Sequence, residues 1–171
     1  MRENTKNLRG FTLVELLAVI VVLAIVMLIA VQAVLPQMER ARRQSFAIEA
    51  NGAIDAAQTY FMSSSLTGGE GFPATEGGTS CVTIEQLYNG GYTELTPSTS
   101  SGTGYSGKVV VQKKGNIYLY YVFLEKDKTW MVYGAGTDVD QFNGAYNGSI
   151  NRDINESNVV DYTAKSDLAV C

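Results

Sequence analysis

A single carboxylic acid, Glu15, interrupts a run of 25 residues, Phe11 to Leu35, that carries no other charged side chain. A carboxylate in apolar surroundings needs a cationic partner, because the hydration free energy that it loses is otherwise not compensated. The chemistry indicated at this position is therefore the pairing of opposite charges. The run itself contains no basic side chain, so the cation must come from another group.

Catalytic chemistry has little support in the rest of the chain. The sequence contains no histidine, which excludes histidine-based triads, imidazole metal sites and imidazole acid–base catalysis. It also shows no nucleophile–base pair, phosphate-binding loop or metal-ligand cluster. We therefore expect a protein that is not an enzyme. A single-span membrane-anchored enzyme or receptor stays open as an alternative.

One group of oxygen-bearing side chains has the composition of a calcium loop: Asp138, Asp140 and Asn143, followed by Gly144. Carboxylate and amide oxygens at short spacing suit that ion, although the spacing does not follow the EF-hand pattern. An acidic surface turn is the favoured explanation of the same residues. Calcium is the only cofactor that the sequence brings into consideration.

The run that contains Glu15 is expected to be a membrane-spanning helix. As an α-helix, its 25 residues would extend over about 37 Å, enough for a ~30 Å hydrocarbon layer with some tilt. Seventeen of them are Leu, Ile, Val or Phe. These side chains favour insertion by roughly 5–10 kcal/mol, which outweighs the ~3 kcal/mol cost of one acid.

The beginning of the chain, from residue 1 to about residue 35, resembles the signal of type IV prepilins. A short leader with three basic residues ends at Gly10, and the sequence Phe11-Thr-Leu-Val-Glu15 then begins the apolar helix. An ordinary secretory signal would place its cleavage site after the apolar core. Here the small residue precedes the core, so the core stays in the mature protein.

This resemblance implies that a prepilin peptidase cuts after Gly10 and that the new amino terminus, Phe11, is N-methylated. The methylated amine stays protonatable and would be the cation that Glu15 needs. Phe11 and Glu15 are four residues apart, close enough to pair within one helix. The amine of a neighbouring subunit in a filament is the alternative partner, and such pairing would select the stagger between helices.

The orientation of the helix also rests on the resemblance. Three basic residues precede the apolar run and three follow it, Arg40, Arg42 and Arg43, so the positive-inside rule does not decide the topology. The arginines are either a solvated face or headgroup anchor, or a contact with acidic heads of adjacent subunits. With the leader inside, the two cysteines, Cys81 and Cys171, lie outside and favour a disulfide.

The part of the chain outside the membrane is acidic. From Gln44 onward, seven basic and fourteen acidic residues give a net charge of −7. This balance argues against nucleic-acid binding through the head.

Behind the apolar half, the pattern predicts an amphipathic second half of the same helix, residues 36–62. A proline such as Pro36 removes one hydrogen bond and usually kinks a helix. Gly52 destabilises the helix by ~1 kcal/mol relative to alanine, so it either packs closely against another group or marks a weak point of the helix. Apolar residues recur at helical spacing along one face of this half, and such an apolar stripe is expected to pack against a sheet. The stripe consists of Phe46, Ala50, Ala53, Ile54, Ala57, Tyr60 and Phe61.

A connection over residues 63–107 and a meander over residues 108–133 are predicted next. The connection contains one short helix, which a capping box of Thr83 and Gln86 begins. The meander has three strands rich in Val, Ile, Tyr and Phe, separated by hairpin-length turns. Its middle strand, Ile117–Leu124, is apolar on both faces and is therefore expected to be covered on both sides.

Residues 134–171 are predicted to form a C-terminal loop region, in which residues 159–162 could add a short edge strand. The expected fold class is therefore α+β. A long N-terminal helix, residues 11–62, has a transmembrane half (11–35) and an amphipathic half (36–62). The amphipathic half packs on a small antiparallel sheet of three to four strands, which is also what the resemblance to type IV pilins implies.

The function that the resemblance implies is that of a structural subunit. The protein would be stored as a single-pass membrane protein and assembled through its N-terminal helix into an extracellular pilus filament for adhesion or surface motility. Its partners would be other copies of itself, other pilins, the prepilin peptidase and the assembly machinery of the cytoplasmic membrane. The nearest alternative is a pseudopilin of a type II secretion or DNA-uptake system, which carries the same signal.

Overall fold

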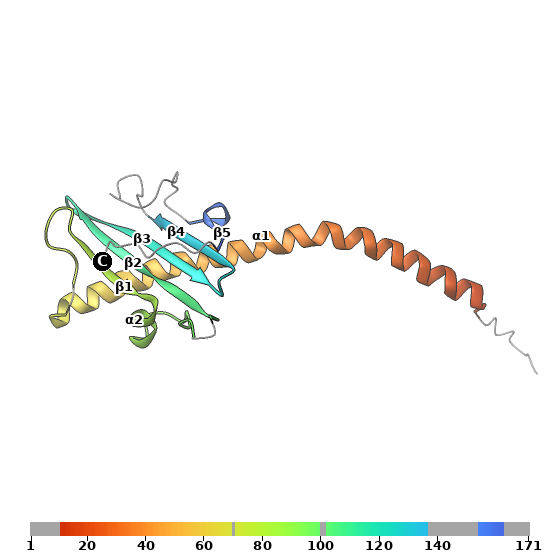
Figure 1. Cartoon of the computed structure of the whole chain (residues 1–171), viewed down its shortest axis with the longest axis horizontal. Coiled ribbons are helices and arrows are strands. Elements are labelled where there is room, and N and C mark those ends of the chain that lie inside the picture. Colours follow the sequence, from red (N-terminus) through yellow and green to blue (C-terminus); the bar gives the residue numbers. More distant parts are fainter. Residues whose placement is uncertain (1–10, 70, 100–101, 137–153, 163–171) are drawn as a thin grey trace, which may run out of the picture. The chain divides into compact units, whose positions relative to one another are not determined.

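The computed structural model describes residues 11–69, 71–99, 102–136 and 154–162 (Figure 1). The chain divides into two compact units, residues 1–41 and 42–171. The second unit contains the sheet and all of the buried hydrophobic residues of the described chain. It therefore has a core of its own.

The long helix α1 runs from Leu13 to Thr67, so it begins two residues later and ends five residues later than predicted. Its last turns include the serine-rich segment, in which hydroxyl groups bond back to carbonyls of the preceding turn. Ser65 Oγ donates to the carbonyl of Met62 (2.9 Å), and Thr67 Oγ1 donates to that of Ser63 (3.2 Å). Gly68, with φ +77°, follows the end of the helix.

The sheet has five strands in chain order, and every neighbouring pair is antiparallel. This confirms the predicted α+β fold and adds a strand to the three or four expected. A two-residue edge strand also lies within the segment 159–162, as anticipated. The strands are β1 (Thr79–Thr83), β2 (Tyr105–Lys114), β3 (Ile117–Lys126), β4 (Trp130–Gly136) and β5 (Val160–Asp161).

The strand that the sequence analysis missed is β1, in the segment that was expected to hold only a short helix. The helix is present as α2 (Ile84–Asn89), directly after β1. Its predicted capping box is confirmed: Thr83 Oγ1 accepts from the backbone of Gln86 (3.1 Å), and Gln86 Oε1 accepts from the backbone of Thr83 (2.9 Å). Thr83 thus ends the strand and begins the helix.

The strand β2 also begins earlier than expected, at Tyr105 rather than Lys108. The glycine-rich sequence before Lys108 suggested a loop, but Gly107 belongs to the strand with φ +138°. A side chain at this position would collide with the carbonyl of Phe123 on the paired strand β3. Glycine is therefore used here for close approach between strands and not for a turn.

The core of the second unit lies between α1 and one face of the sheet (Figure 1). The predicted apolar stripe of the helix is buried there, except for Tyr60, which is partly buried. The opposite face of the sheet carries a second buried group: Val110, Leu119, Tyr121 and Phe123. The prediction that the middle strand is covered on both sides is confirmed, since residues 119–124 are all buried.

The helix-facing side of β3 predicts a loss of stability in alkali. Burial, together with the neighbouring Tyr118, raises the pKa of Tyr120 to about 12. Below pH 10 the phenol is protonated in both the folded and the unfolded chain, so it adds no pH dependence. Between about pH 10 and 12 mainly the unfolded chain loses the proton, which should lower the free energy of unfolding by about 1–2 kcal/mol, less than two full pKa units would give because water screens the phenol in part.

This expectation is checked by urea unfolding of a soluble fragment that begins at Arg42, at pH 8 and pH 11.5. Tyr120→Phe keeps the ring and removes the titrating group. The variant should therefore lose less stability than the parent between the two pH values. Equal losses in the two proteins would show that Tyr120 does not contribute.

Candidate assembly site

The acid in the apolar run is held by the residue that begins the helix. Glu15 Oε2 accepts hydrogen bonds from the backbone nitrogen and the hydroxyl of Thr12, both at 2.9 Å. The hydroxyl of Thr12 in turn accepts from the backbone nitrogen of Glu15 at 3.3 Å. This reciprocal pattern is a capping box, with Thr12 before the first helical residue and Glu15 in the third helical position.

Glu15 was predicted to act through its charge alone, so the capping box is a second role that was not predicted. The signal was present, because a threonine three residues before a glutamate is the pattern of a capping box. The two roles are compatible. Both hydrogen bonds from Thr12 go to Oε2, and Oε1 accepts none within the described part of the chain. Phe11 is exposed at the helix start, while Gly10 lies outside the described residues.

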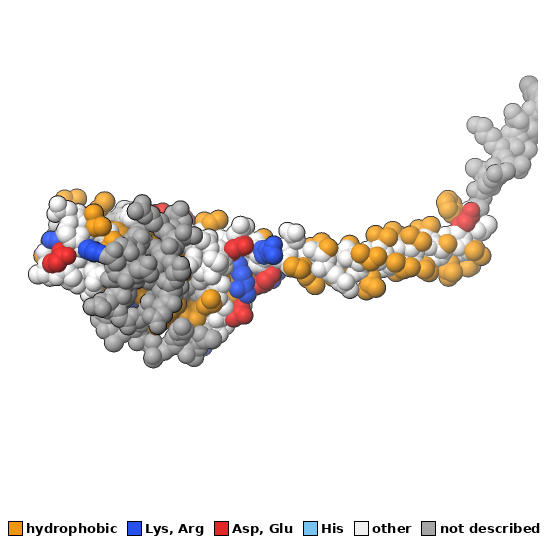
Figure 2. Space-filling model, turned by 90° about the horizontal axis from the view of Figure 1, so that it is seen from above, with side chains coloured by type: hydrophobic (Ala, Val, Ile, Leu, Met, Phe, Trp, Pro, Cys, Tyr) orange, Lys and Arg blue, Asp and Glu red, His pale blue; other side chains and the backbone are white. Residues whose placement is uncertain are grey.

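The part of α1 that follows Glu15 exposes its apolar side chains on every side. All large hydrophobic residues between Leu13 and Leu35 are at least 47% exposed, and none of them is covered by the described chain. This is the one helix of the described residues that is long and apolar enough to cross a membrane. Figure 2 shows hydrophobic side chains along the visible face of this part, followed by a group of charged ones. Such a surface fits membrane anchoring.

The three arginines that follow the apolar run have different roles. Arg43 donates to the carbonyl of Val159 (3.0 Å) and pairs with Asp161 (2.9 Å). It belongs to the second unit and holds the chain beside β5. Arg40 and Arg42 are exposed and make no ion pair or hydrogen bond with any residue that the structure describes. Only these two are available to an external partner.

A second side chain of α1 also holds the C-terminal segment, and no local sequence pattern predicted this contact. Asn51 Nδ2 donates to the carbonyl of Ile154 (2.8 Å), and Asn51 Oδ1 accepts from the backbone nitrogen of Ile154 (3.2 Å). The side chains of Ile154 and Val159 are buried in the core between α1 and the sheet. The segment 154–162 is therefore attached to the helix through its backbone at two places.

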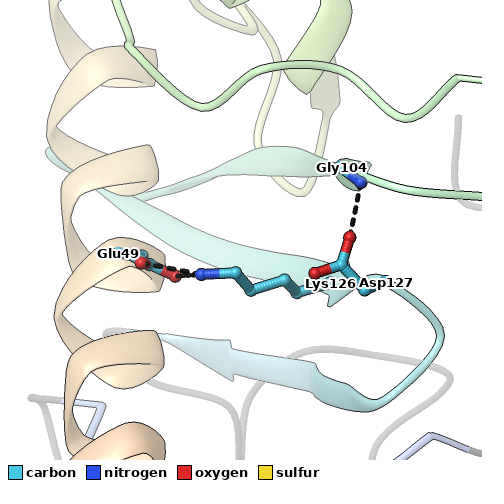
Figure 3. Close-up of polar contacts among 4 residues, drawn as sticks. All are labelled: Glu49, Gly104, Lys126 and Asp127. Atoms are coloured by element: carbon cyan, nitrogen blue, oxygen red, sulfur yellow. Dashed lines mark hydrogen bonds and ion pairs between the residues drawn. The ribbon is translucent and has the colours of Figure 1, made fainter.

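A half-buried ion pair joins the sheet to α1 (Figure 3). Lys126 Nζ lies 3.1 Å and 3.2 Å from the two carboxylate oxygens of Glu49, and 4.7 Å from the ring centre of Tyr105. Burial alone would lower the pKa of Lys126, but the hydrogen bonds with Tyr105 and Glu49 and the charge of Glu49 outweigh it and raise that pKa. Asp127, the next residue, points away from α1. Its carboxylate accepts a hydrogen bond from the backbone nitrogen of Gly104 at 2.6 Å. These contacts position β3 and have no feature of a catalytic site.

The remaining predicted site residues are only partly described. Cys81 lies half-buried in β1, whereas Cys171 lies outside the described residues, so their disulfide stays a prediction. The calcium candidates Asp138, Asp140 and Asn143 also lie outside them. Within the described ranges, no group of three or more Cys, Asp and Glu side chains is arranged to hold a metal ion.

Comparison with known proteins gives a family match that includes the site just described. Residues 5–31 match the family model of the prokaryotic N-terminal methylation motif. No curated protein and no solved structure gives a significant match to the chain. The motif implies processing by a prepilin peptidase and assembly into a pilus-type system. The chain thus carries the class III signal peptide of type IV pilins and pseudopilins, which indicates a precursor of one of these two kinds.

Proposed function

We propose that this protein is the structural subunit of an extracellular type IV pilus. Before assembly it is anchored in the membrane by the apolar half of α1. It then enters a helical filament in which that half packs against the same half of other copies. Its acidic head forms the outer surface, which serves adhesion or surface motility. The protein acts by mechanical assembly and carries out no catalysis.

The observation that carries this proposal is the exposed apolar half of α1 directly after the methylation motif. Every large hydrophobic side chain between Leu13 and Leu35 is exposed, so this surface needs lipid before assembly and other helices after it. The head has its own core and no need of this half. A protein built in this way can leave the membrane only if other apolar helices replace the lipid.

The first test is the mature amino terminus. Cleavage after Gly10 predicts that the assembled protein begins with an N-methylated Phe11, because the methylation motif precedes an intact apolar core. Mass spectrometry of surface material sheared from cells measures this terminus directly. An amino terminus beyond Leu35 would mean that the apolar run is an ordinary signal that is removed.

The second test separates the pilus from its nearest alternative. A pseudopilin of a type II secretion or DNA-uptake system carries the same signal. Electron microscopy with an antibody against the head should show labelled fibres that extend well beyond the cell surface. Label confined to the envelope, together with a secretion or uptake defect in a deletion strain, would instead identify a pseudopilin.

A further inference from the structure

The face of the sheet that is turned away from α1 carries buried apolar side chains that no helix of the described chain covers. We call this group the outer cluster. It consists of Val110, Leu119, Tyr121 and Phe123, none of which is more than 7% exposed. Both described helices, α1 and α2, contribute to the cluster on the other face. Apolar side chains on one face of a sheet stay buried only under a second layer, so the outer cluster needs a cover from elsewhere.

The last nine residues, 163–171, are predicted to be attached at opposite edges of the sheet, and we call them the tail. Before the tail begins, the backbone nitrogen of Tyr162 donates to the carbonyl of Thr129 (2.9 Å), next to the edge strand β5. Cys81, the predicted disulfide partner of Cys171, lies in β1, the other edge strand, and packs against the outer cluster. The predicted bond therefore requires the tail to pass from one edge to the other.

The length of the tail restricts its path. Across the sheet, four spacings of ~4.8 Å separate β5 from β1, which makes about 19 Å. Along the strands, Cys81 is level with Tyr121, and Thr129 lies one position beyond the level of Lys126, which adds about 20 Å at ~3.4 Å for each position. The diagonal is then about 28 Å, whereas nine extended residues reach about 30 Å. A path around α1, which is ~10 Å across, would be too long.

The buried side chains lie where this diagonal passes. Phe123 is on the middle strand of the five, close to the middle of the diagonal, and Val110 is paired with Cys81 at its end. Ile117 shares the face of Phe123 through the two-residue period of β3, but it lies away from the diagonal and is 57% exposed. We infer that the tail crosses the outer face of the sheet from β5 to β1, covers the outer cluster and is fixed there through Cys171.

The other long segment outside the described residues, 137–153, has no comparable need to cross the sheet. It follows Gly136, the last residue of β4, and it leads to Ile154, which is bonded to Asn51 of α1. Strand β4 pairs with β5 at the edge of the sheet, and the segment 154–162 leads directly into β5. Both ends of segment 137–153 are therefore near the same edge, whereas the ends of the tail belong to opposite edges.

The crossing has a consequence for the surface of the head. A partner that approaches from the side away from α1 would meet the tail and not the strands, so the tail sets the chemistry of that surface. Its apolar residues Leu168, Ala169 and Val170 directly precede Cys171 and supply the cover nearest to β1. The inference concerns the head alone and does not depend on the proposed filament.

The path is tested by the length of the tail in full-length protein extracted from membranes. Deleting residues 164–167 leaves five residues that reach about 17 Å, or about 23 Å with the ~6 Å between the Cα atoms of a disulfide. This is too short for the diagonal, so the variant should take up two equivalents of an alkylating agent without reduction. The matched control replaces the same four residues by glycine and serine. The control keeps the length and, like the parent, should take up none.

The cover is tested by a photo-crosslinking amino acid at position 168 of the full-length protein. Mass spectrometry of the digested product should identify peptides of β2 or β3 that contain residues of the outer cluster. The same amino acid at position 157, an exposed position before the tail, should not give these peptides. Products with α1 or with residues 137–153, or no product within the chain, would show that the tail does not cover the cluster.

Each result has one meaning for the inference. If the parent protein contains two free thiols, the tail is not fixed at β1 and the inference fails, while the proposed pilus function is unaffected. If the deletion variant still forms the bond, the tail does not run along the diagonal. If the parent forms no fibres but both tail experiments succeed, the proposed function fails and the inference stands.

Discussion

Cells in which Glu15 is replaced by alanine are expected to contain the protein in their membranes but to form few or no fibres. Removing the acid favours insertion by ~3 kcal/mol, so membrane content should not fall. What the variant loses is the partner for a Phe11 amine of its own chain or of a neighbour. Breaking such a pair in apolar surroundings costs roughly 3–5 kcal/mol, which corresponds to a loss of a hundredfold or more at each contact.

The head should not respond to this change, because all of its core residues lie in the unit that begins at Arg42. Fibre yield and membrane content are measured side by side in one strain. Leu17→Ala, a nearby substitution that keeps the charge, should assemble much better than Glu15→Ala. If Glu15→Ala assembles as well as the parent, the pairing of charges is not what Glu15 provides.

The capping box makes a sharper comparison possible. Glutamine fits the third helical position of a capping box as well as glutamate does, so Glu15→Gln keeps the hydrogen bonds with Thr12 and removes only the charge. If the charge is what matters, Glu15→Gln should fail as Glu15→Ala does. If the helix start is what matters, Glu15→Gln should assemble and Thr12→Val should not.

The second large effect is expected from the cysteines. A bond between Cys81 and Cys171 would close a loop of 91 residues, and the chain-entropy model then gives a stabilisation of about 4.5 kcal/mol, which strain can only reduce. Urea unfolding of the fragment that begins at Arg42, with and without reductant, should show a difference of this order. Cys81→Ser should behave like the reduced parent and should not respond to reductant.

Intact-mass analysis after alkylation without reduction decides whether the bond exists. The folded parent should take up no alkylating agent, and it should take up two equivalents after reduction. Two modified thiols on the unreduced protein would contradict the prediction. The stability of Cys81→Ser would then report only on the packing of one half-buried side chain.

The elements that the sequence predicted well have strong repetitive patterns. The apolar run is uncharged but for one residue over 25 positions, the amphipathic stripe follows helical periodicity, and β3 is apolar on both of its faces. The short helix α2 was predicted from local signals at its two ends, the capping box of Thr83 and Gln86 and the glycines after Asn89. Patterns of this kind do not depend on the rest of the fold.

Apart from the local capping box of Thr12 and Glu15, the features that were missed depend on residues far away in the chain. In β1 only Val82 is buried, so the strand has no alternating pattern and owes its conformation to its pairing with β2. The bonds from Asn51 to Ile154 and from Arg43 to Asp161 join residues that are 103 and 118 positions apart. No local sequence pattern predicts a contact of this kind.

The attachment of segment 154–162 has a consequence for how this surface can change during evolution. Asn51 and Arg43 bond to backbone groups of Ile154 and Val159, and only the side chains of these two residues are buried. Residues 155–158 are at least partly exposed between them. The side chains of Asn155 and Asn158 cap the 3-10 turn of residues 156–158, so they are tied to its conformation. Glu156 makes no side-chain hydrogen bond with a described residue, and substitutions there should leave the turn and both attachments to α1 in place.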